Sequence, residues 1–131
     1  MTLTEKIKTL NLPKGEYVVV GGGVLEILGL RQAGDIDLAV TPAIHQKLRE
    51  TGEWDEEIIH DKIFLKKDDF EINLDVTWPD FQVPLQEIID QAMIIDDIRF
   101  MNLKHLRQFK QALGREKDLK DLALLDEYEK V

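Results

Sequence analysis

Two aspartates separated by one residue give this sequence its clearest chemical signal. Asp35 and Asp37 belong to the stretch DIDLAV, in which apolar residues alternate with them. Successive side chains of a strand point to opposite faces, so a strand here would hold both carboxylates on one face. Two carboxylates on one face repel each other unless a cation lies between them. Because hard divalent cations take carboxylate oxygens as ligands, the spacing predicts a site for Mg²⁺ or Mn²⁺.

A glycine turn precedes these aspartates. Residues 18–20 are three valines, the composition of a buried strand, and Gly21, Gly22 and Gly23 follow directly. Glycine has no Cβ, so this segment can turn sharply and let another group approach the backbone. The segment VLEILGL at residues 24–30 then predicts a short helix. The expected order is strand, glycine turn, helix, loop and the strand of the aspartates.

A third carboxylate follows later in the chain. The stretch EINLDV at residues 71–76 predicts a strand in which Asp75 shares a polar face with Glu71 and Asn73. Taken alone, Asp75 is better explained as a polar residue of a solvent-exposed edge strand. With the glycines and the aspartate pair upstream, we favour a metal site completed by Asp75.

The C-terminal part of the chain is basic although the protein is acidic. Residues 99–120 contain seven Lys or Arg and two acidic residues, a local balance of +5. Because the whole chain has a net charge of −9, the remaining residues together carry −14. Lys110 lies on the same helical stripe as Leu106 and Leu113, and a lysine on a packing face needs a partner or an opening. Lys117 and Asp121, four residues apart, could form a helix ion pair.

These motifs, in this order, carry a resemblance. The pattern Gly21-Gly22 followed by Asp35-x-Asp37 and a later strand with Asp75 resembles the nucleotidyltransferase superfamily related to DNA polymerase beta. The segment LKHLRQFKQALGREKDLKDLALL is similar to the K…R-x-K-D-x-x-D signature of a small bacterial branch, which contains minimal nucleotidyltransferases and abortive-infection toxins. The resemblance covers roughly residues 18–125.

The resemblance implies metal-dependent transfer of a nucleoside monophosphate from an NTP, with ATP as the expected donor, to a hydroxyl acceptor. Asp35, Asp37 and Asp75 would hold two Mg²⁺ or Mn²⁺ ions, which together stabilise the attacking and leaving oxygens. The residues expected to bind the nucleotide are Gly21, Gly22, Gly23, Arg31, Lys110, Arg115 and Lys117. Arg31 could equally be a surface charge, and the C-terminal motif could be partly structural, anchoring the last helix beneath the site.

Length and composition indicate the number of domains, the cellular location and the kinds of partner to expect. With 131 residues we expect one domain over residues 1–131. The chain has no cysteine, no run of about 20 apolar residues and no signal-peptide pattern, which favours a cytoplasmic protein without membrane segments. The net charge of −9 argues against broad electrostatic capture of nucleic acid, although the basic C-terminal face leaves nucleic acid open.

The predicted fold is α/β (α+β): a small mixed sheet with the glycine and aspartate motifs on neighbouring strands, flanking helices and a C-terminal helical pair. Further expected elements include an N-terminal helix at residues 2–12 and a hairpin at residues 92–101 that turns at Asp96-Asp97. Trp54 and Trp78 could stack on a base, but core filling is the favoured interpretation.

The sequence leaves the acceptor and two rival functions open. A chain this short has little room for an acceptor domain, so either the acceptor is small or a partner protein or second copy helps to bind it. One rival is a toxin-type enzyme that modifies tRNA. The other is a catalytically inactive binding module that kept the fold.

Overall fold

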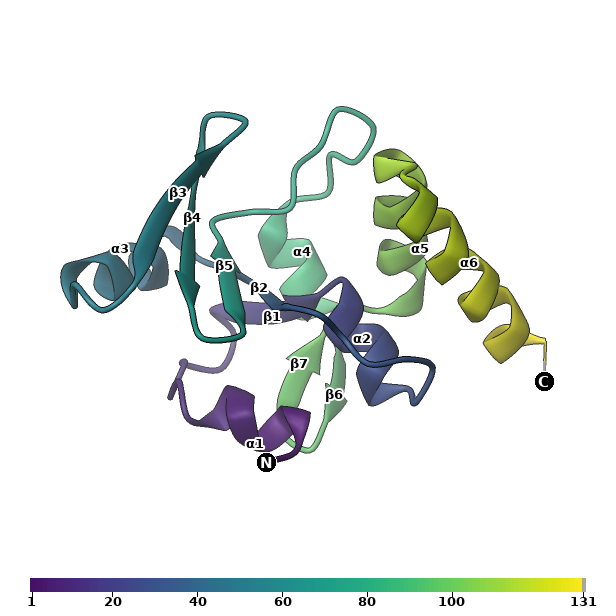
Figure 1. The fold of residues 1–131 in the computed structure, drawn as a ribbon, viewed down its shortest axis with the longest axis horizontal. Coiled ribbons are helices and arrows are strands. Elements are labelled where there is room, and N and C mark those ends of the chain that lie inside the picture. Colours follow the sequence, from purple (N-terminus) through teal and green to yellow (C-terminus); the bar gives the residue numbers. More distant parts are fainter. Residues whose placement is uncertain (131) are drawn as a thin grey trace.

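The computed structural model describes residues 1–130, which form a mixed seven-stranded sheet and six helices (Figure 1). The strand order is β3-β4-β5-β2-β1-β7-β6, with β2–β5 and β1–β7 parallel and the other pairs antiparallel. The elements are α1 (Leu3–Lys8), β1 (Tyr17–Val20), α2 (Gly22–Ile27), β2 (Ile36–Val40), α3 (Pro42–Glu50), β3 (Asp55–Ile59), β4 (Lys62–Lys67), β5 (Phe70–Asn73), α4 (Leu85–Asp90), β6 (Met93–Ile95), β7 (Ile98–Phe100), α5 (Leu103–Leu113) and α6 (Glu116–Glu129). This confirms the predicted α/β class with a C-terminal helical pair.

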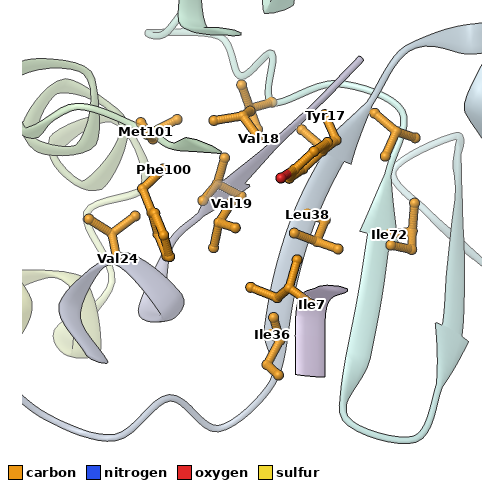
Figure 2. Packing of buried hydrophobic residues seen from close by; sticks show 14 of the residues in the cluster. Ile7, Tyr17, Val18, Val19, Val24, Ile36, Leu38, Ile72, Phe100 and Met101 are labelled. Atoms are coloured by element: carbon orange, nitrogen blue, oxygen red, sulfur yellow. The ribbon is translucent and has the colours of Figure 1, made fainter. Parts of the chain in front are cut away.

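One row of apolar side chains crosses the sheet and faces the core. The strand register pairs Ile72 with Leu38, Leu38 with Val19, and Val19 with Phe100. All four side chains are fully buried, and Figure 2 shows them beside Ile7 from α1. Burying an aliphatic or aromatic side chain of this size contributes about 1.5–3 kcal/mol. The alternation of β2 therefore fixes which way its aspartate points.

The neighbouring row lies on the opposite face and is polar. Here the register pairs Lys66 with Glu71, Glu71 with Asp37, and Asp37 with Val20. Since adjacent residues of a strand alternate faces, Asp37 and Glu71 point away from the side on which Leu38 and Ile72 are buried. This arrangement positions two carboxylates on neighbouring parallel strands.

Three peripheral parts of the chain surround that polar face. The β3–β4 hairpin lies at one side in Figure 1, and the α5–α6 pair lies at the other, with the loop from β5 to α4 between them. The hairpin turns at His60 and Asp61, which both adopt positive φ, as a two-residue hairpin turn requires. Gly114, in the left-handed conformation, ends α5 and lets α6 fold back against it.

Several predicted boundaries differ from the structure. The N-terminal helix ends at Lys8 rather than near residue 12, and the glycine-turn helix spans Gly22–Ile27 rather than residues 24–30. The hairpin at Asp96-Asp97 is confirmed, with positive φ at both residues. None of the helices within residues 1–130 combines the length and apolar character needed to cross a membrane.

The strand predicted over residues 71–76 is wrong at its end, because β5 stops at Asn73. Asn73 pairs with Ala39, and β2 has only Val40 left before Pro42 begins α3. Because β2 ends here, β5 has no parallel strand left to pair with, and Asp75 lies in the loop beyond β5.

Candidate active site

A cavity of about 920 Å³ opens between the ends of β1, β2 and β5, the β3–β4 hairpin and the α5–α6 pair. Most of the residues predicted to do chemistry line it. They are Gly21, Gly22, Arg31, Asp35, Asp37, Asp75, Lys110, Arg115 and Lys117. Of the predicted set only Gly23 is not part of its wall. Segments that are far apart in the sequence thus meet at one place, as the motif pattern predicted.

The glycine turn and the aspartate strand meet through their strand pairing. Val20 is the register partner of Asp37, so Gly21 follows at the point where the Asp37 side chain emerges. Gly21 has φ +63°, and a Cβ built on it would lie 3.2 Å from Oδ2 of Asp37. Both the backbone conformation and the close carboxylate require glycine at this position.

Gly22 and Gly23 have different surroundings. A Cβ on Gly22 would lie 3.4 Å from both terminal guanidinium nitrogens of Arg31, so Arg31 packs over the glycine turn. A Cβ on Gly23 would lie 2.7 Å from Cγ1 of Val19, inside the core. Gly23 therefore packs α2 against β1, and the contact of its backbone N–H with phosphate stays a prediction.

Asp37 carries the most perturbed carboxyl group of the cavity. Its pKa is raised to about 7, first by burial and then by the nearby charges of Glu71 and Asp35, against opposition from Lys110 and Lys117. The pKa of Glu71 is also raised, first by burial. Within residues 1–130, no ion pair reaches Asp35, Asp37 or Glu71. This side of the cavity thus holds uncompensated negative charge.

Asp75 lies in the same cavity but has a cationic partner. Its Oδ1 accepts hydrogen bonds from Nζ of Lys62 at 2.6 Å and from the backbone N–H of Thr77 at 2.9 Å. Nζ of Lys62 also donates to the carbonyl of Thr77 at 2.8 Å. Asp75 therefore ties the loop after β5 to the β3–β4 hairpin, and in the parallel register Glu71 is the carboxylate paired with Asp37.

The predicted basic motif forms a buried ion network in the wall of the cavity. Nζ of Lys110 lies 3.2 Å from Oδ1 of Asp118 and 2.8 Å from Oδ2 of Asp121, and all three side chains are at most 5% exposed. Arg31 donates to both oxygens of Asp121, at 2.7 and 2.8 Å. Nε of Arg115 donates to Oδ2 of Asp118 at 2.6 Å. The structural interpretation of this motif is confirmed: it anchors α6.

These contacts set the ionisation of the two aspartates. Burial opposes the charged form of Asp118 and Asp121, but hydrogen bonds from Arg115, Arg31 and Lys110 outweigh it and hold both pKa values below their ordinary range. With Lys110, Arg31 and Arg115 charged, the five groups carry a net +1. The possible Lys117–Asp121 pair is absent from the described ion pairs, because Arg31 and Lys110 occupy that carboxylate. Lys117 lines the cavity instead.

No group of three or more His, Cys, Asp or Glu side chains is arranged to hold a metal ion in the described part of the chain. Mg²⁺ in phosphoryl-transfer sites uses one or two carboxylates together with substrate phosphates and water. Asp35 and Asp37 suit such a site, because both carboxylates line the cavity. They are also close enough that the charge of Asp35, after burial and Glu71, helps to raise the pKa of Asp37. The donor chemistry therefore fits a cation that arrives with a phosphate ligand.

Searches of protein-family models, curated proteins and solved structures gave no match to this chain. The functional argument therefore depends on the cavity itself. The residues that line it without having been predicted as site residues include Glu71, Asn73 and Trp78. The shared face of residues 71, 73 and 75 was a usable signal for Glu71 and Asn73. No signal in the sequence places Trp78 beside the hairpin.

Proposed function

We propose that this protein is a metal-dependent nucleotidyltransferase that moves a nucleoside monophosphate from an NTP, ATP in the first instance, to a hydroxyl acceptor. One observation carries the proposal: Asp35, Asp37 and Glu71 line one cavity without ion-pair partners, next to the glycine turn at Gly21 and Gly22. An anionic cluster facing basic residues suits a metal-bound triphosphate better than a free anion or a free cation.

Different residues of the chain would have different roles in binding the phosphates. Gly21 and Gly22 line the cavity beside Asp37 and Arg31, and their backbone would face the phosphates. Lys117, from the first turn of α6, supplies positive charge inside the cavity. Arg31 and Lys110 contribute charge while their carboxylate partners hold them in place. A phosphate contact by Arg31, Lys110 or Arg115 remains part of the proposal. Such preorganised charge stabilises a transition state without rearranging during the reaction.

Asp35 and Asp37 would hold the metal. When bound, Mg²⁺ or Mn²⁺ neutralises charge on the phosphate oxygens and orients the attack on the α-phosphorus. In the reaction, the acceptor oxygen bonds to the α-phosphorus, and the bond from that phosphorus to pyrophosphate breaks. The hydroxyl proton passes to a carboxylate oxygen, a role that we assign to Glu71 because Asp75 is already bonded to Lys62.

The direct test is label transfer. The protein is incubated with each α-labelled NTP, Mg²⁺ or Mn²⁺ and a cell extract, and whatever becomes labelled is identified. We expect transfer that requires the divalent ion and is abolished by Asp35→Asn with Asp37→Asn. Asp55→Asn with Glu57→Gln is a matched control, since it alters two carboxylates at the same spacing on the exposed strand β3. Absence of label with all four NTPs would contradict the proposal.

A further inference from the structure

A second part of the cavity wall is aromatic and apolar. His60, from the turn of the β3–β4 hairpin, and Trp78, from the loop between β5 and α4, form an edge-to-face pair with ring centroids 5.2 Å apart and an interplanar angle of 81°. Both residues line the cavity. The apolar residues that also line the cavity include Ile59, Phe64, Val76, Phe109, Leu113 and Leu124. We call Trp78 and His60 the aromatic pair.

The backbone around Trp78 is fixed on both sides. Trp78 and Phe81 exchange two backbone hydrogen bonds, at 3.0 and 2.8 Å, which close a tight turn. Phe81 is buried and its ring lies 5.4 Å from that of Phe109 on α5. On the other side, Lys62 holds the carbonyl of Thr77 and the carboxylate of Asp75. The indole is therefore positioned before any ligand arrives, which lowers the entropic cost of binding against it.

The cavity wall also includes a residue, Asn73, that has an unpaired polar atom. Oδ1 of Asn73 is buried and has no hydrogen-bond partner among residues 1–130. Buried polar atoms without a partner are rare, and an amide can pair with the edge of a planar heterocycle through both its oxygen and its nitrogen. Asn73 lines the same cavity as the aromatic pair and the aspartates. The cavity thus combines stacking surface, one amide and a phosphate-directed charged region.

We infer that the aromatic pair and Asn73 bind a nucleobase. The inference rests on the proposed function, because it extends that site by naming what lies beyond the phosphates. Every base has a planar π-face that stacks on aromatic side chains, whereas an aliphatic acceptor would gain little from an indole fixed in this way. The base could belong to the donor NTP or to a nucleoside acceptor, and the two sources are experimentally separable.

Tryptophan fluorescence gives the first test. The chain has two tryptophans, and Trp54 is 8% exposed and packs against Phe70 outside the cavity. In the Trp54→Phe variant, Trp78 is the only remaining tryptophan, so the tryptophan emission reports on Trp78 alone. We expect adenosine and ATP with Mg²⁺ to quench its emission, and inorganic tripolyphosphate to leave it unchanged. No quenching by adenosine or ATP at millimolar concentration would overturn the inference, and this result needs no substitution at Trp78.

Calorimetry on Trp78→Leu gives the second test. Loss of base stacking should weaken ATP binding roughly 10- to 100-fold, while tripolyphosphate affinity stays the same. Trp54→Phe serves as the control and should bind both ligands like the unaltered protein. Unchanged affinity of Trp78→Leu for both ATP and adenosine would contradict a stacking role.

Competition identifies the source of the base. If ATP displaces adenosine, the aromatic pair holds the donor base; if adenosine adds further quenching at saturating ATP, it holds an acceptor base. Failure of this inference can be told from failure of the proposed function. Label transfer without quenching would remove the base site and leave the enzyme, whereas quenching without label transfer would leave a nucleobase site in a protein with another activity.

Discussion

Asp37 lies directly opposite Glu71 in the register of the parallel strands β2 and β5. Burial and then the charge of Glu71 raise the pKa of Asp37, and the pKa of Glu71 is itself raised, first by burial. The described residues provide neither carboxylate with an ion-pair partner. This pairing puts negative charge at one end of the cavity. On the other side, the network of Asp118 and Asp121 with Arg31, Lys110 and Arg115 carries a slight positive excess. The contrast leads to four predictions.

The first prediction concerns the pH dependence of stability. The pKa of Asp37 is about 7 in the folded protein, above its ordinary value of 3.8, so its contribution to stability is complete below pH 3.8 and is lost as the pH rises through 7. Asp37→Asn removes this loss. We expect the variant to be more stable than the unaltered protein at pH 8, by at most about 4 kcal/mol, with a smaller gain at pH 5. Urea unfolding at both pH values measures the difference, and an equal gain at both would argue against the raised pKa.

The second prediction concerns the metal. Mg²⁺ or Mn²⁺ should relieve the repulsion between Asp35 and Asp37 and raise the melting temperature, since a ligand that binds only the folded state stabilises it. Asp35→Asn with Asp37→Asn should remove this response while the protein stays folded. Thermal unfolding with and without the ion provides the measurement. An unchanged metal response in the double variant would move the cation site elsewhere.

The third prediction concerns Lys110. Lys110→Met keeps the length of the side chain but leaves Asp118 and Asp121 without one of their buried cations. Removing one partner of a buried pair costs about 3–5 kcal/mol, and the remaining bonds from Arg115 and Arg31 place this case near the lower value. Lys104→Met on the exposed side of the same helix is the control, with a change near zero. Denaturant unfolding that gave a fully stable Lys110→Met would contradict the structural role.

The fourth prediction separates two adjacent glycines. Gly22→Val would bring a branched side chain against Arg31 and Ala33 at the cavity wall, so ATP binding should fail while the fold survives. Gly23→Ala would force a methyl group to within 2.7 Å of Val19 in the core, which should cost about 1–3 kcal/mol. Calorimetric ATP titration and thermal unfolding of both variants test this contrast. Normal ATP affinity in folded Gly22→Val would count against a phosphate-binding turn.

The parts of the fold that depend on local pattern could be predicted from the sequence. The alternation in DIDLAV predicted which residues of β2 enter the core, and the β-branched run before the glycines predicted β1. The two helices separated by Gly114 followed from helical periodicity and a stop signal. In each case the information lies within about ten residues.

Features that depend on how the strands pair with one another could not be predicted from the sequence. Asp75 matched the expected spacing, but β5 ends at Asn73 because β2 gives way to α3, and only the sheet pairing shows that Glu71 is opposite Asp37. The contact between His60 and Trp78 likewise joins a hairpin turn to a loop, and no periodic pattern connects them.

The bond between Arg31 and Asp121 spans 90 residues, and it has a consequence for how the protein is made. Contacts between distant parts of a chain form late, because a long loop must close before they contribute. A nascent chain can pair β1, β2 and β5 while α6 is still inside the ribosome. Arg31 then lacks its carboxylate, and the wall of the cavity above Gly22 has no anchor. The sheet can therefore precede the site, and synthesis must reach the last helix before the protein acquires its candidate active site.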